Sequence, residues 1–462
     1  MRATKVICTL ACLFVATGVC AGKNEEGVGL TIYNDNFAVV RQAKQMGFEA
    51  GVNTVKFTDV AAAIDPTSVN FKCLSAPGAI SILEQNYEYD LVNAESLLKR
   101  YIDRDVTVII GGSGADAARE LSGKLLAAVG GEYILARETS GIEVVNRGRV
   151  EEISLKALPE DLVTRPTLVW LADAKEAGEQ LCQVTYTTEQ INWKADYSAV
   201  LSEDETSLDF SGWVTIDNKS GATYRDAALK LIAGDVRRIT PPQMPVYRMP
   251  MAAEMMEAKG GFEEKAFMEY HMYTLGRKST INNNQVKQIE FITPAPGVAA
   301  KKLFIYNRQE NPEKMQVKIE FENTEENKLG IALPNGKVRV FKKDPADENL
   351  EFVGEDEIDH TPRKEKLSLY IGNAFDIVPE YKLIDSKQGY RTRTETHQVE
   401  LRNRKDTPIE VCVDEKFMQW ANWEVLEKSH DFEKYDAYTA RFKVKIAADS
   451  TETIKYIVRQ WW

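Results

Sequence analysis

A glycine-rich segment is the first place where the sequence suggests chemistry. Gly112-Ser-Gly114-Ala-Asp-Ala117 matches the pattern G-x-G-x-x-G/A, follows the apolar run VTVII and precedes Glu138. In a dinucleotide-binding fold such glycines let the backbone approach a pyrophosphate at the start of a helix. That fold also needs several alternating strands and helices, whereas Gly123-Lys-Leu-Leu-Ala-Ala-Val-Gly-Gly is typical of a strand between turns. We therefore predict a flexible hairpin loop rather than a nucleotide site.

Thioether and imidazole side chains gather in a second segment. They are soft ligands that suit Cu(I), which makes a copper site conceivable. Their spacing is irregular, however, and methionine is also a flexible side chain that fills adaptable packing surfaces. We therefore predict a loop or packing segment and keep Cu(I) binding as the alternative. The residues are Met244, Met249, Met251, Met255, Met256, Met268, His271 and Met272.

Histidines and acids offer a third possibility, a hydrolytic site. Asp359 precedes His360 and could orient its imidazole as a general base requires, and Glu355, Asp356 and Glu357 could supply a carboxylate pair or a calcium site. No nucleophile motif accompanies them, and the D-x-D-x-D-G spacing is absent, so a solvated turn is the default. We assign no catalytic, cofactor-binding or metal-binding residue and no cofactor. The histidines are His271, His360, His397 and His430.

The N-terminus has the features of a secretory signal peptide. Arg2 and Lys5 precede a mainly apolar run, and Val19 and Ala21 occupy the small-residue positions of a cleavage site after Ala21. The run is too short for a comfortable membrane anchor. A lipoprotein signal at Cys20 is the weaker alternative, because valine precedes the cysteine where a small residue is wanted. We predict an exported protein, periplasmic or on the cell surface, with no transmembrane segment after signal removal.

Charge and cysteine content narrow the class of protein further. The 462 residues carry a formal net charge of −12, which disfavours nucleic acid and anionic membranes as partners. Beyond the signal peptide only Cys73, Cys182 and Cys412 remain, with no CxxC spacing. In an oxidising compartment one disulfide is possible, but a disulfide framework is not. The interpretation we favour is that each cysteine is a small buried hydrophobe.

The elements that would position these residues are strands. The stretch Val184–Arg238 has apolar residues at every second position, a period that places them on one face of a pleated strand. We expect Trp193, Tyr197, Phe210 and Trp213 to stabilise the core of this region. The alternating residues are Trp193, Ala195, Tyr197, Ala199 and Leu201, then Leu208, Phe210, Gly212, Val214 and Ile216, then Leu229, Leu231 and Ala233.

Length and strand spacing predict an all-β chain of several small sandwich or barrel domains in tandem. Near the C-terminus, Phe442–Ile446 and Ile454–Val458 are expected to pair as a hairpin within an immunoglobulin-like sandwich. The predicted segments are 1–21 (signal peptide), 27–95 (small N-terminal β domain), 96–160 (small barrel-like domain), 165–385 (central β-sandwich, with 240–275 as a loop or helix insertion) and 386–462 (immunoglobulin-like sandwich).

Several blocks of the sequence resemble segments of a bacterial protein family. They occur in the same order as in the family and are spread over nearly the whole mature chain. The family is the domain of unknown function 4139 (DUF4139) family, which is related to mucoidy-inhibitor-A-like proteins. The resemblance implies an exported, β-rich protein without an assigned activity, and it implies no catalytic residues. The blocks are LTIYNDNFAVVR, DVAAAIDPTSV, SILEQNYEYDL, LVTRPTLVWL, SGWVTIDNKSGATYRDAALKLIAGDV, FVGEDEIDHTPRKE and GNAFDIV.

Two functional hypotheses follow from these observations. The first is a non-enzymatic binding or structural module of the bacterial cell envelope, whose partner is a protein or a cell-envelope polymer. The alternative is an envelope hydrolase that acts on glycan or peptide with an unrecognised acid or histidine site. The first is favoured because no catalytic constellation is evident, although fold alone is weak support for a function.

Overall fold

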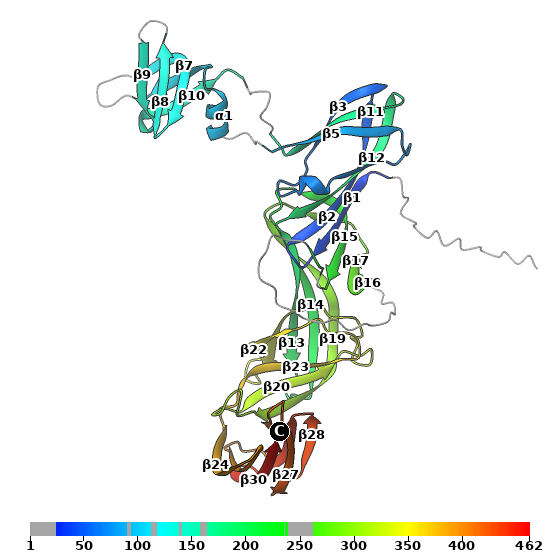
Figure 1. The fold of residues 1–462 in the computed structure, drawn as a ribbon, viewed down its shortest axis with the longest axis vertical. Helices are drawn as coiled ribbons and strands as arrows, with labels where there is room; N and C mark the ends of the chain where they lie inside the picture. Colours follow the sequence, from blue (N-terminus) through cyan, green and yellow to red (C-terminus); the bar gives the residue numbers. More distant parts are fainter. Residues whose placement is uncertain are drawn as a thin grey trace, which may run out of the picture. The chain divides into compact units, whose positions relative to one another are not determined.

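The computed structural model describes residues 25–89, 94–111, 118–137, 141–157, 164–234, 236–238 and 262–462. The architecture is nearly all β, as predicted, with several separate sheets and a single α-helix among the residues described. No helix in this part of the chain is long and apolar enough to cross a membrane. Figure 1 labels the elements along the chain. The described residues form two compact units, of which unit 2 comprises Gly29–Val40, Ala61–Asp65 and Thr187–Trp462, and unit 1 comprises the remainder.

Unit 1 contains a three-stranded antiparallel sheet in which β11 lies between β3 and β5. Trp170 of β11 is buried between Phe57 and Phe71, and its indole N–H donates to Gln85 Oε1 over 2.9 Å. β11 lies within the predicted central segment 165–385, yet it pairs with β3 and β5, which lie within the predicted N-terminal segment 27–95. The strands of this sheet are β3 (Gly51–Thr58), β5 (Ile80–Glu88) and β11 (Thr167–Ala174). β4 (Asn70–Cys73) pairs with β12 (Gly178–Glu189) in another sheet, and the short 3₁₀ helix is Pro66–Ser68.

A second sheet of unit 1 is inserted in sequence between β5 and β11. Its five antiparallel strands have the order β10-β6-β7-β8-β9, and Leu98 of α1 and Tyr101 directly after α1 contribute to its core. β9 and β10 are its two edges, so the sheet is open rather than a closed barrel. The elements are α1 (Ala94–Arg100), β6 (Asp105–Ile110), β7 (Arg119–Val129), β8 (Glu132–Arg137), β9 (Gly141–Asn146), the 3₁₀ helix Arg147–Arg149 and β10 (Val150–Leu155).

Unit 2 is built around the long antiparallel strands β13, β14 and β19 (Figure 1). β21 extends this sheet by pairing in parallel with β13 and antiparallel with β22. Every alternating residue predicted from the sequence to face the core is buried in β13, β14 and β15. β15 pairs in parallel with the N-terminal β1 and antiparallel with β17. The strands are β1 (Gly27–Tyr33), β13 (Ile191–Leu201), β14 (Ser207–Asn218), β15 (Tyr224–Ala233), β16 (Phe262–Phe267), β17 (Tyr270–Leu275), β18 (Ser279–Ile281), β19 (Gln285–Tyr306), β21 (Gly336–Lys343) and β22 (Leu350–Ile358). β2 (Phe37–Phe48) contributes residues to both units.

One aromatic residue of this region lies on the opposite face from the one we expected. Trp193, Tyr197 and Phe210 are buried, as predicted, whereas Trp213 is 44% exposed. Trp213 is one position out of phase with Gly212 and Val214, so the pleat of β14 turns its side chain to solvent. The expectation that Trp213 stabilises the core is therefore wrong.

The C-terminal part of unit 2 is a β-sandwich. A sheet of β24, β25, β30 and β27 packs on β26, β29 and β28, and both sheets contribute to one apolar core. β20 pairs with β19 and β23, and β26 pairs in parallel with the end of β19, which links the sandwich to the central sheet. The strands are β20 (Gln316–Glu322), β23 (Lys366–Asn373), β24 (Ile377–Gly389), β25 (Thr392–Asn403), β26 (Ile409–Lys416), β27 (Asn422–Lys428), β28 (Phe432–Asp436), β29 (Thr439–Ile446) and β30 (Ser450–Trp461).

The hairpin expected between β29 and β30 is not formed. β29 pairs with β26 and β28, and β30 pairs with β25 and β27, so the two strands belong to opposite sheets. Phe442 and Tyr456 meet across the core, with ring centroids 5.0 Å apart. An alternating pattern gives the inward face of each strand, but it cannot distinguish a neighbour in the sheet from a strand across the core.

Candidate functional site

The glycine-rich segment connects two adjacent antiparallel strands. Residues Gly112–Ala117 and Glu138 lie outside the described residues, but Ile110 of β6 pairs directly with Arg119 of β7. The residues from Gly123 onward form part of strand β7, as predicted, and not a helix. A pyrophosphate site of the dinucleotide-binding type needs a helix after the glycines, so this connection is that of a β-hairpin.

The methionine-rich segment is only partly described. Met244 to Met256 lie outside the described residues, Met268 is exposed, and Met272 and His271 lie on β17. His271 Nδ1 is 2.7 Å from Glu264 Oε1, and the other oxygen of Glu264 accepts from the amide of Ala332. Within the described ranges, no group of three or more histidine, cysteine or acidic side chains could hold a metal ion.

The acids near His360 line neither of the two clefts that are described below. Glu355, Asp356 and Glu357 lie on strand β22 rather than in the expected turn. The hydrogen bond from Lys337 lowers the pKa of the Glu355 carboxyl, which is opposite to the shift that a general acid requires. His360 is exposed, and its Nδ1 accepts from the amide of Asn335 over 3.1 Å. The geometry therefore gives the hydrolase hypothesis no support at these residues.

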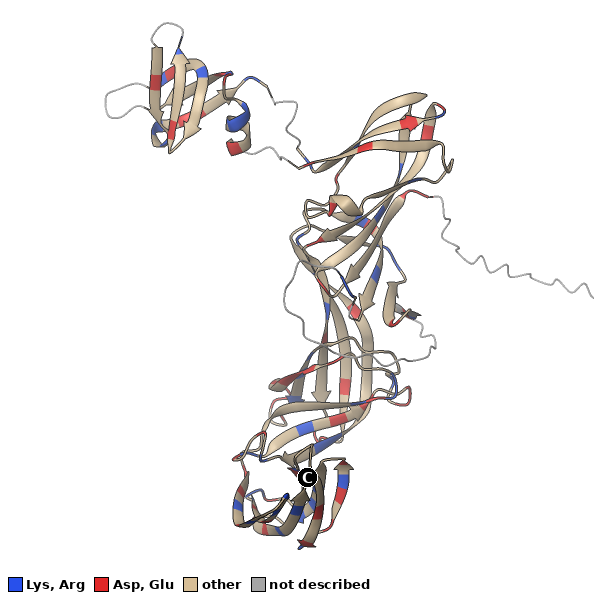
Figure 2. Ribbon diagram, viewed as in Figure 1, with Lys and Arg blue, Asp and Glu red and all other residues tan. Residues whose placement is uncertain are grey.

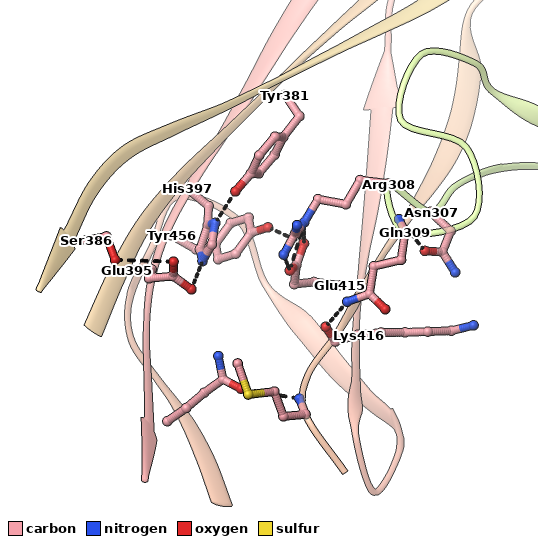
Figure 3. Close-up of polar contacts among 12 residues, drawn as sticks. Asn307, Arg308, Gln309, Tyr381, Ser386, Glu395, His397, Glu415, Lys416 and Tyr456 are labelled. Carbon is pink, nitrogen blue, oxygen red and sulfur yellow. Dashed lines mark hydrogen bonds and ion pairs between the residues drawn. The ribbon is translucent and has the colours of Figure 1, made fainter. Parts of the chain in front are cut away.

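A polar cluster that we did not predict lies inside the C-terminal sandwich (Figure 3). His397 Nδ1 is 2.8 Å from the hydroxyl of Tyr381, and its ring stacks on Tyr456 at 5.0 Å. Tyr456 donates to Glu415 Oε2 over 2.7 Å, and Arg308 Nε lies 3.0 and 3.1 Å from the two oxygens of the same carboxylate. The cluster draws on β24, β25, β26, β30 and the segment after β19, so it ties both sheets together.

Burial determines what this cluster can do. His397, Glu415 and Tyr456 are each at most 2% exposed. Burial lowers the pKa of His397 although Glu415 and Glu395 oppose the shift, and burial raises the pKa of Tyr456 well above its usual value. A neutral imidazole closed off from solvent cannot exchange protons with a substrate. The cluster is therefore a structural feature, and a sequence signal for it existed, because Glu395 and His397 share the inward phase of Val399 and Leu401.

We expect the free energy of unfolding to decrease as the pH is lowered, because of His397. Its folded-state pKa is lower than the usual 6.5, so the unfolded chain takes up the proton first as the pH decreases. The stabilising contribution is complete above pH 6.5 and is lost as the pH falls from there toward the folded-state pKa. Urea midpoints at about pH 7.5 and about pH 5.5 should differ less for His397→Gln than for the unmodified protein. His430→Gln, at a solvent-accessible ring, is the control; an unchanged pH dependence in His397→Gln would contradict the assignment.

The end of the same sandwich presents aromatic side chains to solvent. We call Tyr390, Trp420, Trp461 and Trp462 the aromatic end. Tyr390 is 90% and Trp420 63% exposed, and Trp420 meets Trp462 edge to face with ring centroids 5.0 Å apart. The residues are brought together by topology, because Trp461 pairs with both Thr392 of β25 and Asn422 of β27.

The loop that carries Trp420 is anchored by a buried side chain and by backbone hydrogen bonds. Phe417 is buried and packs on Trp423, with ring centroids 4.5 Å apart. The amide of Met418 donates to Gln460 Oε1 over 3.3 Å, and the amide of Ala421 donates to the carbonyl of Met418. These contacts hold the loop in place while leaving the indole of Trp420 outside. The aromatic end is thus an exposed surface on a fixed support.

Two clefts are also present in unit 2. A cleft of about 280 Å³ is lined by Lys301, Lys302 and Lys405, with Phe304 at its apolar wall. A second cleft, of about 350 Å³, lies beside the turn 202–207. No histidine lines either cleft, so neither pairs a nucleophile with an imidazole base. Charges of both signs are interspersed over the described elements (Figure 2), which agrees with the absence of a basic tract in the sequence.

The comparisons with known proteins add no relative. The chain matches no model of a known protein family, and no curated protein matches it. The resemblance to the DUF4139 family stays a prediction.

Proposed function

We propose that this chain is an exported, non-enzymatic binding module of the bacterial cell envelope, and that the aromatic end contacts an envelope glycan. The observation that carries the proposal is the pair Trp420 and Trp462, exposed at right angles on an anchored loop and strand end. Tryptophan and tyrosine contribute large contact areas at little entropic cost and dominate many binding surfaces. Export is supported by the signal-like residues 1–21 and by the family resemblance.

A glycan fits this surface better than a second folded protein does. The exposed residues Tyr390 and Trp420 each have an exposed polar neighbour in the sequence, Arg391 beside Tyr390 and Asn422 two positions after Trp420. A sugar ring has C–H faces that stack on an indole and hydroxyl edges that hydrogen-bond to such polar neighbours. A protein interface of the usual kind instead has a continuous desolvated centre. The proposed partner is therefore the polysaccharide part of the envelope.

Co-sedimentation with purified peptidoglycan sacculi tests the proposal. The protein is isolated from the envelope fraction, where its mass is expected to match a chain that begins at Gly22. We expect Trp420→Ala to weaken binding about tenfold, because truncation of a central aromatic contact costs more than about 1.4 kcal/mol. Trp213→Ala, which removes an exposed indole on β14, is the matched control and should bind like the unmodified protein.

Digestion of the sacculi separates the possible partners. Muramidase treatment should abolish sedimentation of the protein, whereas protease treatment should not. Loss of binding after protease alone would show that the partner is a protein. Equal binding by the Trp420→Ala and Trp213→Ala variants, or no binding at all, would remove the aromatic end from consideration.

A further inference from the structure

Two of the three cysteines of the described chain face each other across neighbouring strands of unit 1. β4 and β12 pair antiparallel, and Cys73 lies directly opposite Cys182. They are 109 positions apart in the sequence, so their approach is a product of the fold alone. Cys412 lies on β26 in unit 2. The three cysteines of the described residues thus comprise one facing pair and one separate thiol.

The hydrogen-bond pattern shows which kind of cross-strand position the pair occupies. The amide of Leu74 donates to the carbonyl of Leu181 over 2.7 Å, so Leu74 and Leu181 form a hydrogen-bonded pair. Such pairs alternate with non-hydrogen-bonded ones along an antiparallel ladder, and Cys73–Cys182 is the next pair. At non-hydrogen-bonded positions the Cα atoms are about 4.5 Å apart and the side chains are closest. Disulfides span Cα separations of about 4.4 to 6.8 Å.

The two thiols differ in their access to solvent. Cys182 is fully buried, and burial together with the neighbouring Cys73 raises its pKa to about 12. Cys73 keeps 8% of its surface exposed on β4, which is an edge strand. Its Sγ lies 3.7 Å from the hydroxyl of Ser75 and 3.8 Å from Gln180 Oε1, so it faces a polar rim. Cys73 is therefore the sulfur that an external reagent reaches first.

We infer that Cys73 and Cys182 are a disulfide-forming pair that is oxidised by an external disulfide donor. The thiolate of Cys73 attacks the donor, which forms a mixed disulfide and releases one donor thiolate. The thiol of Cys182 then loses its proton to solvent and attacks the sulfur of Cys73, which forms the protein disulfide and releases the second donor thiolate. The protein loses two electrons and two protons, and the donor disulfide becomes two thiols.

The bond would close a loop around the inserted sheet. All of α1 to β10 lies between Cys73 and Cys182 in sequence. Cross-linking across so long a loop restricts the unfolded chain strongly. We expect the oxidised protein to unfold at a temperature about 5 °C higher than the reduced protein. This consequence does not depend on glycan binding by the aromatic end.

Thiol counting with the full-length mature protein tests the inference. After treatment with oxidised glutathione, denatured protein should show one free thiol in place of three, and its peptide map should contain a Cys73–Cys182 cross-link. The Cys412→Ala variant keeps two thiols, and both should be consumed by the same cross-link after the same treatment. Cys73→Ser and Cys182→Ser should form no intramolecular cross-link, and both variants are checked for native circular dichroism.

Three outcomes would overturn the inference. The first is that all three thiols remain free at an oxidant concentration that fully oxidises a small dithiol. The second is a stable mixed disulfide at Cys73 that does not resolve onto Cys182. The third is a cross-link that includes Cys412. Because sedimentation with sacculi is measured separately, failure of either proposal leaves the other open to its own test.

Discussion

Replacing Trp193 with alanine is expected to lower the free energy of unfolding by about 3–5 kcal/mol. The side chain is 3% exposed, and its indole N–H donates to the carbonyl of Ile232 over 3.1 Å. Its ring meets Tyr273 edge to face at 6.2 Å. Alanine at this position leaves a large cavity and removes the hydrogen bond from the indole to the carbonyl of Ile232. Equilibrium urea denaturation followed by circular dichroism measures the change.

The matched control is Trp213→Ala in the strand that pairs with β13. Trp213 is 44% exposed, and its substitution should change the free energy of unfolding by less than about 1 kcal/mol. The two variants remove the same side chain from the same hairpin, but they differ in the burial of the indole and in the contacts that are lost with it. Equal destabilisation by both substitutions would show that the core does not lie on the face occupied by Trp193.

Replacing Arg308 with methionine is expected to destabilise the C-terminal sandwich by about 3 kcal/mol. Glu415 is 2% exposed, and Arg308 is its cationic partner through two oxygens. Without the guanidinium the carboxylate stays in a buried site with the Tyr456 hydroxyl. A buried charge without a counter-ion costs several kcal/mol, whereas the methionine side chain retains much of the packing. Urea denaturation of the full chain reports this loss.

The double variant Arg308→Met, Glu415→Leu separates the charge effect from lost packing. Removing both charges should restore much of the stability, because well-packed apolar residues often replace a buried ion pair at little cost. Lys416→Ala breaks the nearby pair with Glu310, whose side chains are 42% and 45% exposed. It should cost less than about 1 kcal/mol. A double variant as unstable as Arg308→Met alone would argue against an unpaired charge as the cause.

The positions of the strands follow from the sequence far better than their partners do. Alternation identifies the buried residues of β13 to β15, because a pleat has a fixed period of two. It does not place β29 and β30 in opposite sheets, nor does it return β11 to the first sheet. Pairing depends on contacts between segments that are far apart in the sequence, which a local pattern does not contain.

The same limit applies to the sites. His397 has the inward phase of Val399 and Leu401, so its burial was open to prediction, but its contacts with Tyr381 and Tyr456 come from separate strands. Trp420 and Trp462 meet only because β27 and β30 are neighbours. The facing of Cys73 and Cys182 requires the register of β4 on β12. In each case the sequence contains the residue types, whereas the order of the strands brings their side chains close together.

The parallel pairing of β1 with β15 determines when one edge of β1 can be covered as the chain is synthesised. Gly29 to Tyr33 are matched with Ala228 to Ile232, so this edge of β1 can be paired only after the ribosome has delivered β15, whereas β2 borders the other edge of β1 and follows it directly in the sequence. Pairing over such a sequence distance is slow, because the loop must close before contacts compensate for the lost entropy. One edge of β1 consequently stays open in the nascent chain until β15 has been made, which delays completion of this sheet for the interval in which the proposed export would take place.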